Sequence, residues 1–155
     1  GHIIQVVQTI KSDTFSVQGS ANVWADITGF SATITPASTS NKVLVWVTGS
    51  MACSHNAEHI ALQVVRGSST VVGGHTSLGS RSPALTAHQT IAASNNAEAT
   101  GGHFLDSPST TSATTYKIKC YSGGQIFYLN RATTDTDNAH YMRGVSTLTL
   151  MEIKV

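Results

Sequence analysis

Histidines and acidic residues are the side chains of this sequence that could carry chemistry. Seven histidines and eight acidic residues occur in 155 residues, and the closest histidine pair is His55 and His59. On a helix, two histidines four residues apart can chelate zinc. The surrounding sequence indicates strand or loop, where such residues lie about 13 Å apart. We therefore predict no bound metal within one chain. In a trimer, one histidine from each of three chains could still bind a metal at the threefold axis, so that alternative remains.

The acidic residues do not form an obvious catalytic pair. Glycan cleavage usually needs two convergent carboxylates, whereas Asp135 and Asp137 lie in a turn, where capping is favoured over cation binding. No nucleophile elbow, phosphate loop or Cys–His arrangement is visible, and Gly73-Gly74 and Gly101-Gly102 are interpreted as turns. We predict that the protein is not an enzyme and needs no cofactor.

Charge is sparse and evenly spread. Only 11% of the residues are charged and the net charge is +1, against about 25% charged in an ordinary domain. Without a basic patch, nucleic-acid binding is not expected. No apolar run approaches the roughly 20 residues that span a bilayer, so membrane insertion is not expected either. The length fits one domain over residues 1–155, and Gly1-His2 is interpreted as a cloning or cleavage scar, with the natural protein continuing upstream.

The elements that must position any site are short strands. Alternating apolar and polar segments, separated by Gly, Ser, Asn and Pro, indicate an all-β chain. We predict an antiparallel β-sandwich of jelly-roll type with about eight to twelve strands. The expected strands are Ile3–Ile10, Val23–Thr28, Phe30–Thr35, Lys42–Cys53, Ile60–Arg66, Thr70–Val72, Leu85–Ala92, Tyr116–Tyr121, Gln125–Asn130 and Ser146–Val155. Gly29 and Gly123-Gly124 are interpreted as turns.

The segment 42–53 has the clearest core signature. Val43, Val45 and Val47 fall on one face, while Leu44 and Trp46 fall on the other. A strand that is apolar on both faces is typically covered on both sides. We therefore predict that Leu44 and Trp46 contribute to a contact between subunits of a homotrimer.

The two cysteines, Cys53 and Cys120, lie in strand-like segments far apart in the sequence. Free cysteine is among the most buried residue types and packs as a small apolar side chain. We interpret both as buried thiols. A disulfide between them remains the alternative, although nothing in the sequence indicates an oxidising compartment.

Three stretches of the sequence resemble the C-terminal domains of bacteriophage tail-fibre proteins. They are Ile34-Thr35-Pro36 followed by Ser38–Val45, then Leu105-Asp106-Ser107-Pro108 through Ile118, and Arg143-Gly144 with Ser146–Ile153. The resemblance covers nearly the whole chain and implies a homotrimeric β-sandwich head on a fibre, located in the virion. It further implies adsorption to a bacterial surface receptor, either a glycan or an envelope protein. It carries no catalytic motif onto this chain.

Receptor contact would fall on the polar loops, where aromatic and hydrogen-bonding side chains suit a shallow glycan site. The candidate contact residues are His75, Arg81, Asn95, Asn96 and Tyr141. The leading alternative is a structural trimerisation or capping module of a fibre that binds no receptor. Two further alternatives are an enzyme that cleaves capsule or lipopolysaccharide, and a cellular trimeric jelly roll of the tumour-necrosis or complement type.

Overall fold

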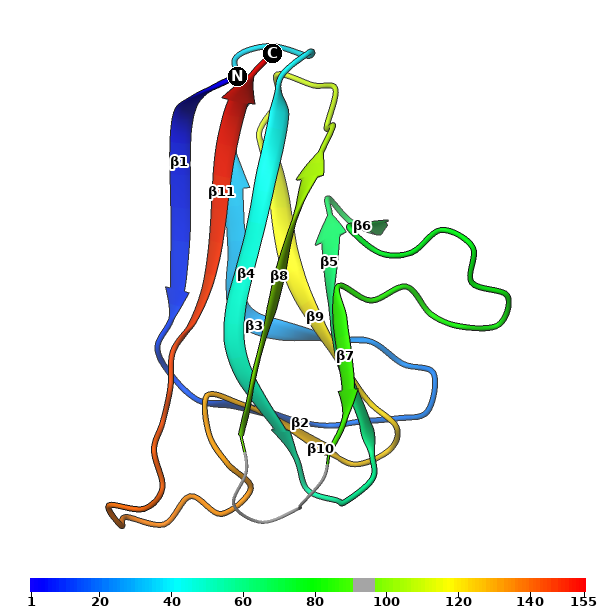
Figure 1. The fold of residues 1–155 in the computed structure, drawn as a ribbon, viewed down its shortest axis with the longest axis vertical. Coiled ribbons are helices and arrows are strands. Elements are labelled where there is room, and N and C mark those ends of the chain that lie inside the picture. Colours follow the sequence, from blue (N-terminus) through cyan, green and yellow to red (C-terminus); the bar gives the residue numbers. More distant parts are fainter. Residues whose placement is uncertain (91–96) are drawn as a thin grey trace.

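The computed structural model describes residues 1–90 and 97–155 as a β-sandwich (Figure 1). Within these residues there are strands and no helix, and therefore no helix that could cross a membrane. The strands are β1 (His2–Lys11), β2 (Phe15–Gln18), β3 (Ala25–Ile34), β4 (Lys42–Cys53), β5 (His59–Arg66), β6 (Thr70–Val72), β7 (Thr86–Gln89), β8 (Glu98–Asp106), β9 (Thr114–Ser122), β10 (Ile126–Leu129) and β11 (Ser146–Lys154).

The chain forms one long antiparallel hairpin that is folded over on itself. Working inward from the two termini, β1 pairs with β11, β3 with β9, β4 with β8, and β5 with β7. Winding this hairpin gives one sheet in the order β1-β11-β4-β8 and another in the order β3-β9-β5-β7. This is the two-sheet arrangement of a jelly roll, and it confirms the predicted fold class.

Period-two alternation explains how the core forms. On β4, Val43, Val45 and Val47 are fully buried, because successive side chains of a strand point to opposite faces. Tyr116 and Ile118 on β9 are equally buried. Burying apolar surface of this kind stabilises a fold by about 25 cal/mol per Å². The other members of the core come from both sheets: Ile27, Phe30, Ala32, Ile34, Met51, Cys53, Ile60, Leu62, Val64, Cys120, Phe127, Leu129, Leu148 and Leu150.

Both cysteines lie in this core as predicted, Cys53 at the end of β4 and Cys120 on β9, and both are free. Burial raises the pKa of the Cys120 thiol to about 12 and also raises the pKa of Cys53. A thiol that stays protonated is a poor nucleophile. The two side chains therefore behave as small apolar residues.

The region around Gly29 differs from the prediction. The sequence predicted two strands, 23–28 and 30–35, with a turn at Gly29, but β3 is continuous over Ala25–Ile34. Gly29 has φ of +77°, and the pairing of β3 with β9 shifts register between Asp26 and Ser31. The glycine therefore makes an irregularity within one strand, and this places Ile27 and Phe30 on the same buried side.

Gly101-Gly102 was predicted as a turn, and that prediction was wrong. Both residues lie inside β8, which pairs with β4 over nine residues from Val43 to Met51. A Cβ on Gly101 would collide with the carbonyl oxygen of Val47, and one on Gly102 would press on Leu85 at 3.1 Å. Glycine is therefore needed at 101, where the neighbouring backbone comes close, whereas a side chain at 102 would require Leu85 to move slightly.

Gly123-Gly124 is a turn, but it does not join the two arms of a hairpin. The strand that follows, β10, pairs with β2 and β4 in the other sheet and has no ladder with β9. The turn therefore carries the chain across the sandwich. The predicted strand 85–92 is shorter in the structure, where β7 covers Thr86–Gln89, and residues 91 and 92 lie outside the described part.

The two chain termini lie side by side at one end of the sandwich, where His2 pairs with Lys154 (Figure 1). The connections 54–58 and 130–145 lie at the other end, and the 73–85 loop projects from one side. The molecule therefore has one end that carries the termini and an opposite end that carries loops.

Candidate functional site

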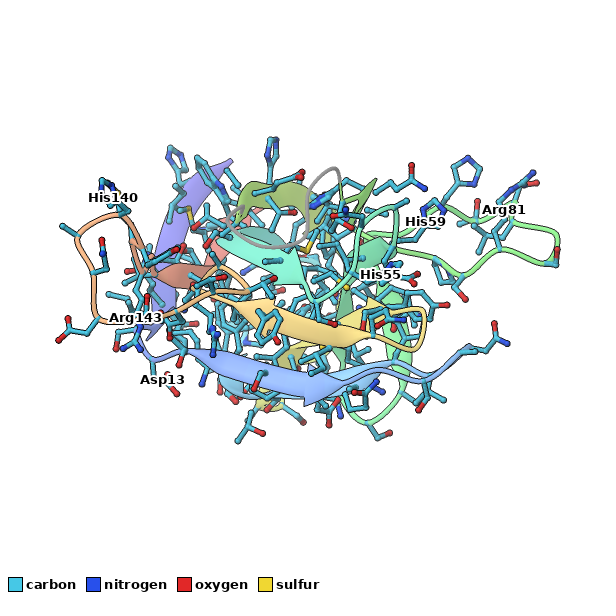
Figure 2. The ribbon with its side chains drawn as sticks, turned by 90° about the horizontal axis from the view of Figure 1, so that it is seen from below. Asp13, His55, His59, Arg81, His140 and Arg143 are labelled. Atoms are coloured by element: carbon cyan, nitrogen blue, oxygen red, sulfur yellow. The ribbon has the colours of Figure 1, made fainter. Side chains whose placement is uncertain are left out.

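The residues predicted to contact a receptor do not form one cluster. His75 and Arg81 lie on the projecting 73–85 loop, whereas Tyr141 lies in the 130–145 connection. Figure 2 shows Arg81 far out on its loop, with His140 and Arg143 on the opposite side of the molecule. Asn95 and Asn96 lie outside the described residues. The sequence left open which of these loops gather, and the structure divides them between the side and the end of the sandwich.

The histidine pair is separated by a turn. His55 is exposed in the connection after β4, and its Nδ1 atom lies 2.7 Å from the carbonyl oxygen of Asn56. His59 begins β5 on the side of the molecule where Arg81 lies (Figure 2). Within residues 1–90 and 97–155, no three histidine, cysteine or acidic side chains gather as metal ligands.

Asp135 was predicted to cap a turn, but its carboxylate instead accepts hydrogen bonds from Arg143. The Arg143 Nε and Nη2 atoms donate to its two oxygens at 3.0 and 2.7 Å. This hydrogen bonding is the main reason that the pKa of Asp135 is lowered, and the nearby Arg131 lowers it further. The carboxylate is therefore engaged in an ion pair, and the cap is made by Asn138, whose Oδ1 accepts from the His140 backbone.

The outer side of the sheet β1-β11-β4-β8 carries one fully apolar row beside rows that also hold threonine, Gln8 and His103. Val6, Met151, Leu44 and Leu105 stand next to one another across its four strands. The next row contains Trp46, whose exposed fraction is 46%. We call this surface the apolar face and define it by Val6, Ile10, Leu44, Trp46, Leu105 and Met151.

The apolar face is not flat. Trp46 lies beside a shallow hollow of about 260 Å³. Its ring packs against His103, with the two ring centroids 5.7 Å apart. The side chains that define this hollow with Trp46 are Gln8, Thr48, Thr147, Thr149 and Met151, none of which is charged. A large ring next to an uncharged hollow is a shape that another protein surface can match.

The opposite outer surface, on the sheet β3-β9-β5-β7, is different in character. Trp24 and Tyr121 form an aromatic pair with ring centroids 5.5 Å apart and planes inclined at 43°. Next to Tyr121 across the ladder stand Ala61 on β5 and Ala87 on β7. Two small residues beside two large rings leave a hollow of about 530 Å³, which we call the aromatic groove.

The 73–85 loop forms the wall of the aromatic groove. Gln63 Nε2 donates to the Pro83 carbonyl oxygen at 2.7 Å, and the Leu85 backbone N–H donates to Leu62 at 2.8 Å. These bonds hold the end of the loop against β5. Ser80, Arg81 and Ser82 then line the groove together with Asn22 and His59.

A second hollow of about 470 Å³ shares Asn22, Trp24 and Ser82 with the first, so the two form one elongated depression. Lys119 lines this second part. None of the residues that line either part is acidic. The depression therefore combines aromatic rings, hydroxyl and amide groups, and basic side chains.

Trp24, Tyr121 and His59 were not among the residues predicted to contact a receptor. A signal was present, because Tyr121 follows Lys117 and Lys119 on the solvated side of β9. A large aromatic residue on the polar face of a strand lacks a core to enter, which marks an exposed contact. What the sequence could not provide was the pairing of β3 with β9 that places Trp24 beside it.

No protein-family model matches this chain, and no curated protein matches it in sequence. Solved structures share its fold. A protein of T=1 particles derived from infectious bursal virus is 13% identical with a TM-score of 0.51, over 97% of this chain and 36% of that chain. The VP2 subviral particle of infectious bursal disease virus is 12% identical with a TM-score of 0.49, over 96% of this chain and 37% of the other. The chain thus spans little more than a third of these proteins.

Proposed function

We propose that this chain is a non-enzymatic structural module of a virus particle, and specifically the head of a bacteriophage tail fibre that contacts the host surface as a homotrimer. The observation that carries the proposal is the apolar face. An exposed apolar sheet surface in a chain of low charge is typical of a protein that associates with others. Copies of the same chain are the partner that a fibre head would supply.

Two further features support the proposal. The structural neighbour with a TM-score of 0.51 comes from T=1 virus particles, so this type of sandwich serves as a building block in at least one virion. In addition, both termini lie at one end. An attachment at either terminus therefore leaves the loop end and the aromatic groove accessible to a host surface.

The mass of the protein in solution tests the assembly. Sedimentation equilibrium of the wild-type chain should give three times the 16.3 kDa chain mass. Trp46→Asp places a charge in the apolar face and should shift the protein to monomers. Val71→Asp, which places the same charge at an exposed apolar residue of β6 in the other sheet, should remain trimeric. A wild-type chain that stays monomeric at high concentration would overturn the trimer.

Binding to cells separates the leading proposal from a trimerisation or capping module without a receptor. The fluorescently labelled trimer should decorate bacteria of the host strain and block adsorption of the parent phage. Heat-stable trimers that bind no envelope would favour the capping module, because the apolar face supports assembly in either case. Release of fragments from host polysaccharide would instead indicate an enzyme.

A further inference from the structure

We propose that the aromatic groove binds an acidic oligosaccharide, with Trp24 and Tyr121 as its stacking platform and Arg81 as the residue that recognises a sugar carboxylate. This inference rests on the proposed function, because it names the class of receptor that a fibre head would bind. It also assigns the contact to one side of the sandwich rather than to its loop end.

The platform suits a pyranose ring. The C–H groups on one side of a sugar ring form an apolar patch with slight positive charge, and the face of an aromatic ring is slightly negative. Trp24 and Tyr121 are both half-buried, so each is fixed by packing and still presents part of its ring. Their 43° inclination offers two facets of different direction, which fits consecutive rings of a chain better than one flat ligand.

The rim supplies the polar groups that would fix the ligand. Asn22, Ser80 and Ser82 line the same hollow as the two rings. A binding site of this type combines an apolar surface with a few convergent hydrogen-bonding groups. Amide and hydroxyl groups can both donate and accept, which matches the hydroxyl groups of a sugar.

Charge favours an acidic over a neutral saccharide. The Arg81 side chain forms no ion pair with any described residue, and its one hydrogen bond to those residues runs from Nη1 to the Leu78 carbonyl at 3.2 Å, beside the Arg81 backbone N–H at 3.1 Å. Its remaining N–H groups have the fork geometry that binds a carboxylate at two points. Lys119 adds positive charge in the adjoining hollow, partly offset by Asp26 at 3.7 Å.

Assembly through the apolar face would leave this groove open. The two sheets pack against each other through their buried sides, so the outer surfaces of the sandwich point in opposite directions. A trimer that covers Trp46 therefore directs Trp24 outward. One chain can thus use one sheet for assembly and the other for the ligand.

The two tryptophans allow both surfaces to be read in a single sample. Trp24 and Trp46 are the two tryptophans of the chain. Protein labelled with 5-fluorotryptophan therefore gives one fluorine resonance for each surface. We would titrate it with oligogalacturonate hexasaccharide, oligoalginate and the neutral maltohexaose. The acidic sugars should shift the Trp24 resonance until it saturates and should leave the Trp46 resonance unchanged. Adding 0.5 M NaCl should weaken the binding of the acidic sugars.

Variants test the assigned roles by calorimetry. Arg81→Gln should lower the affinity for the acidic sugars about tenfold, as the loss of a charge-assisted hydrogen bond does. Lys154→Gln removes an equal charge at the end of the molecule that carries the termini and should leave the affinity unchanged. Ala87→Trp should fill the hollow and abolish binding, and Trp46→Leu should not affect it. Equal binding of maltohexaose would overturn the charge selectivity, and an unmoved Trp24 resonance with all three sugars would overturn the site.

Whole cells distinguish failure of this inference from failure of the proposed function. If the labelled trimer decorates host bacteria and Ala87→Trp decorates them equally, the groove is not the receptor site, whereas the adsorption function stands. If the trimer binds acidic sugars but no host cells, the groove stands and the adsorption function fails.

Discussion

At the scale of single residues, several buried polar side chains are hydrogen-bonded to partners from distant parts of the chain. Asn130 is fully buried, and its Nδ2 donates to the carbonyls of Lys11 and Asp13 while its Oδ1 accepts from Ser146. Asp106 on β8 accepts from the Tyr116 hydroxyl at 2.7 Å and from Arg66 at 2.6 Å. Burial is also the main reason that the pKa of Tyr116 is raised. These bonds tie loops to strands and one sheet to the other.

Glu152 offers a sharp test of such pairing. Its Oε1 accepts from the Ala37 backbone at 2.7 Å and from Asn41 Nδ2 at 2.5 Å, and the residue is 1% exposed. Glu152→Leu leaves both donors without a partner and should lower the free energy of unfolding by about 2–4 kcal/mol. Glu152→Gln keeps an acceptor oxygen and should cost under about 1 kcal/mol. Urea denaturation at fixed protein concentration measures both, and equal losses would contradict this account.

The Asp135–Arg143 pair should depend on pH. Because Arg143 lowers the pKa of Asp135 in the folded state, the pair contributes stability above the unfolded pKa and loses it as pH falls through the folded pKa. Carbon-detected NMR titration should therefore find the Asp135 pKa below 3.8 in the wild type and closer to that value in Arg143→Gln. Arg81→Gln is the matched control and should leave it unchanged. The stability difference between wild type and Arg143→Gln should vanish in strong acid.

At the scale of elements, β4 holds the first sheet together. It pairs with β11 and β10 along one edge and with β8 along the other. Its inner side chains enter the core, and its outer side chains Leu44 and Trp46 form the centre of the apolar face. A change in the register of β8 would therefore disturb both the core and the proposed assembly surface.

Substitution of Gly101 should disturb the pairing of β8 with β4. A Cβ there would meet the Val47 carbonyl oxygen in the neighbouring strand, so Gly101→Ala should destabilise the fold by about 1–3 kcal/mol. Ala99→Ser, at an exposed position of the same strand, should change stability by less than about 0.5 kcal/mol. Chemical denaturation compares them, and a neutral Gly101→Ala would show that β8 is not held as closely as described.

At the scale of the whole molecule, the sandwich has two unlike outer surfaces. One carries the exposed apolar residues Val6, Trp46 and Leu105 among uncharged threonines, and the other holds the aromatic groove, with Arg81 in its lining and Lys119 in the adjoining hollow. A protein that assembles with copies of itself and also binds a ligand benefits from separating the two tasks on opposite sheets. The proposed trimer and the proposed glycan site therefore do not compete for surface.

If assembly contributes to folding, thermal stability should depend on protein concentration. Association stabilises the folded state by mass action, so Tm should rise by about 2–4 °C for each tenfold increase in concentration of a trimer of this chain size. In Trp46→Asp, Tm should be lower and independent of concentration. Differential scanning calorimetry over a hundredfold range measures this, and a constant wild-type Tm would argue against coupled assembly.

The sequence by itself determined the fold class, most strand positions and the inward faces. Val43, Val45 and Val47 are buried as their alternation predicted, and Tyr116, Ile118, Leu148 and Leu150, which alternate in the same way on predicted strands, are buried too. Alternation is a local property, because neighbouring side chains on a strand must point to opposite faces. For the same reason the glycines at 29, 101 and 102 were misinterpreted, since a glycine in a turn and one at a close backbone contact look alike in sequence.

Only the tertiary structure decided which residues meet. Trp24 lies beside Tyr121, and the small residues Ala61 and Ala87 leave a hollow next to the two rings. Strand pairings between residues up to about a hundred positions apart bring these side chains together. Arg81 and Tyr141, both predicted as receptor-contact residues, belong to separate surfaces. Long-range pairing depends on how the whole hairpin winds into two sheets. No local pattern of residue types encodes that winding, so a surface site built from three strands and two loops appears only once the chain is folded.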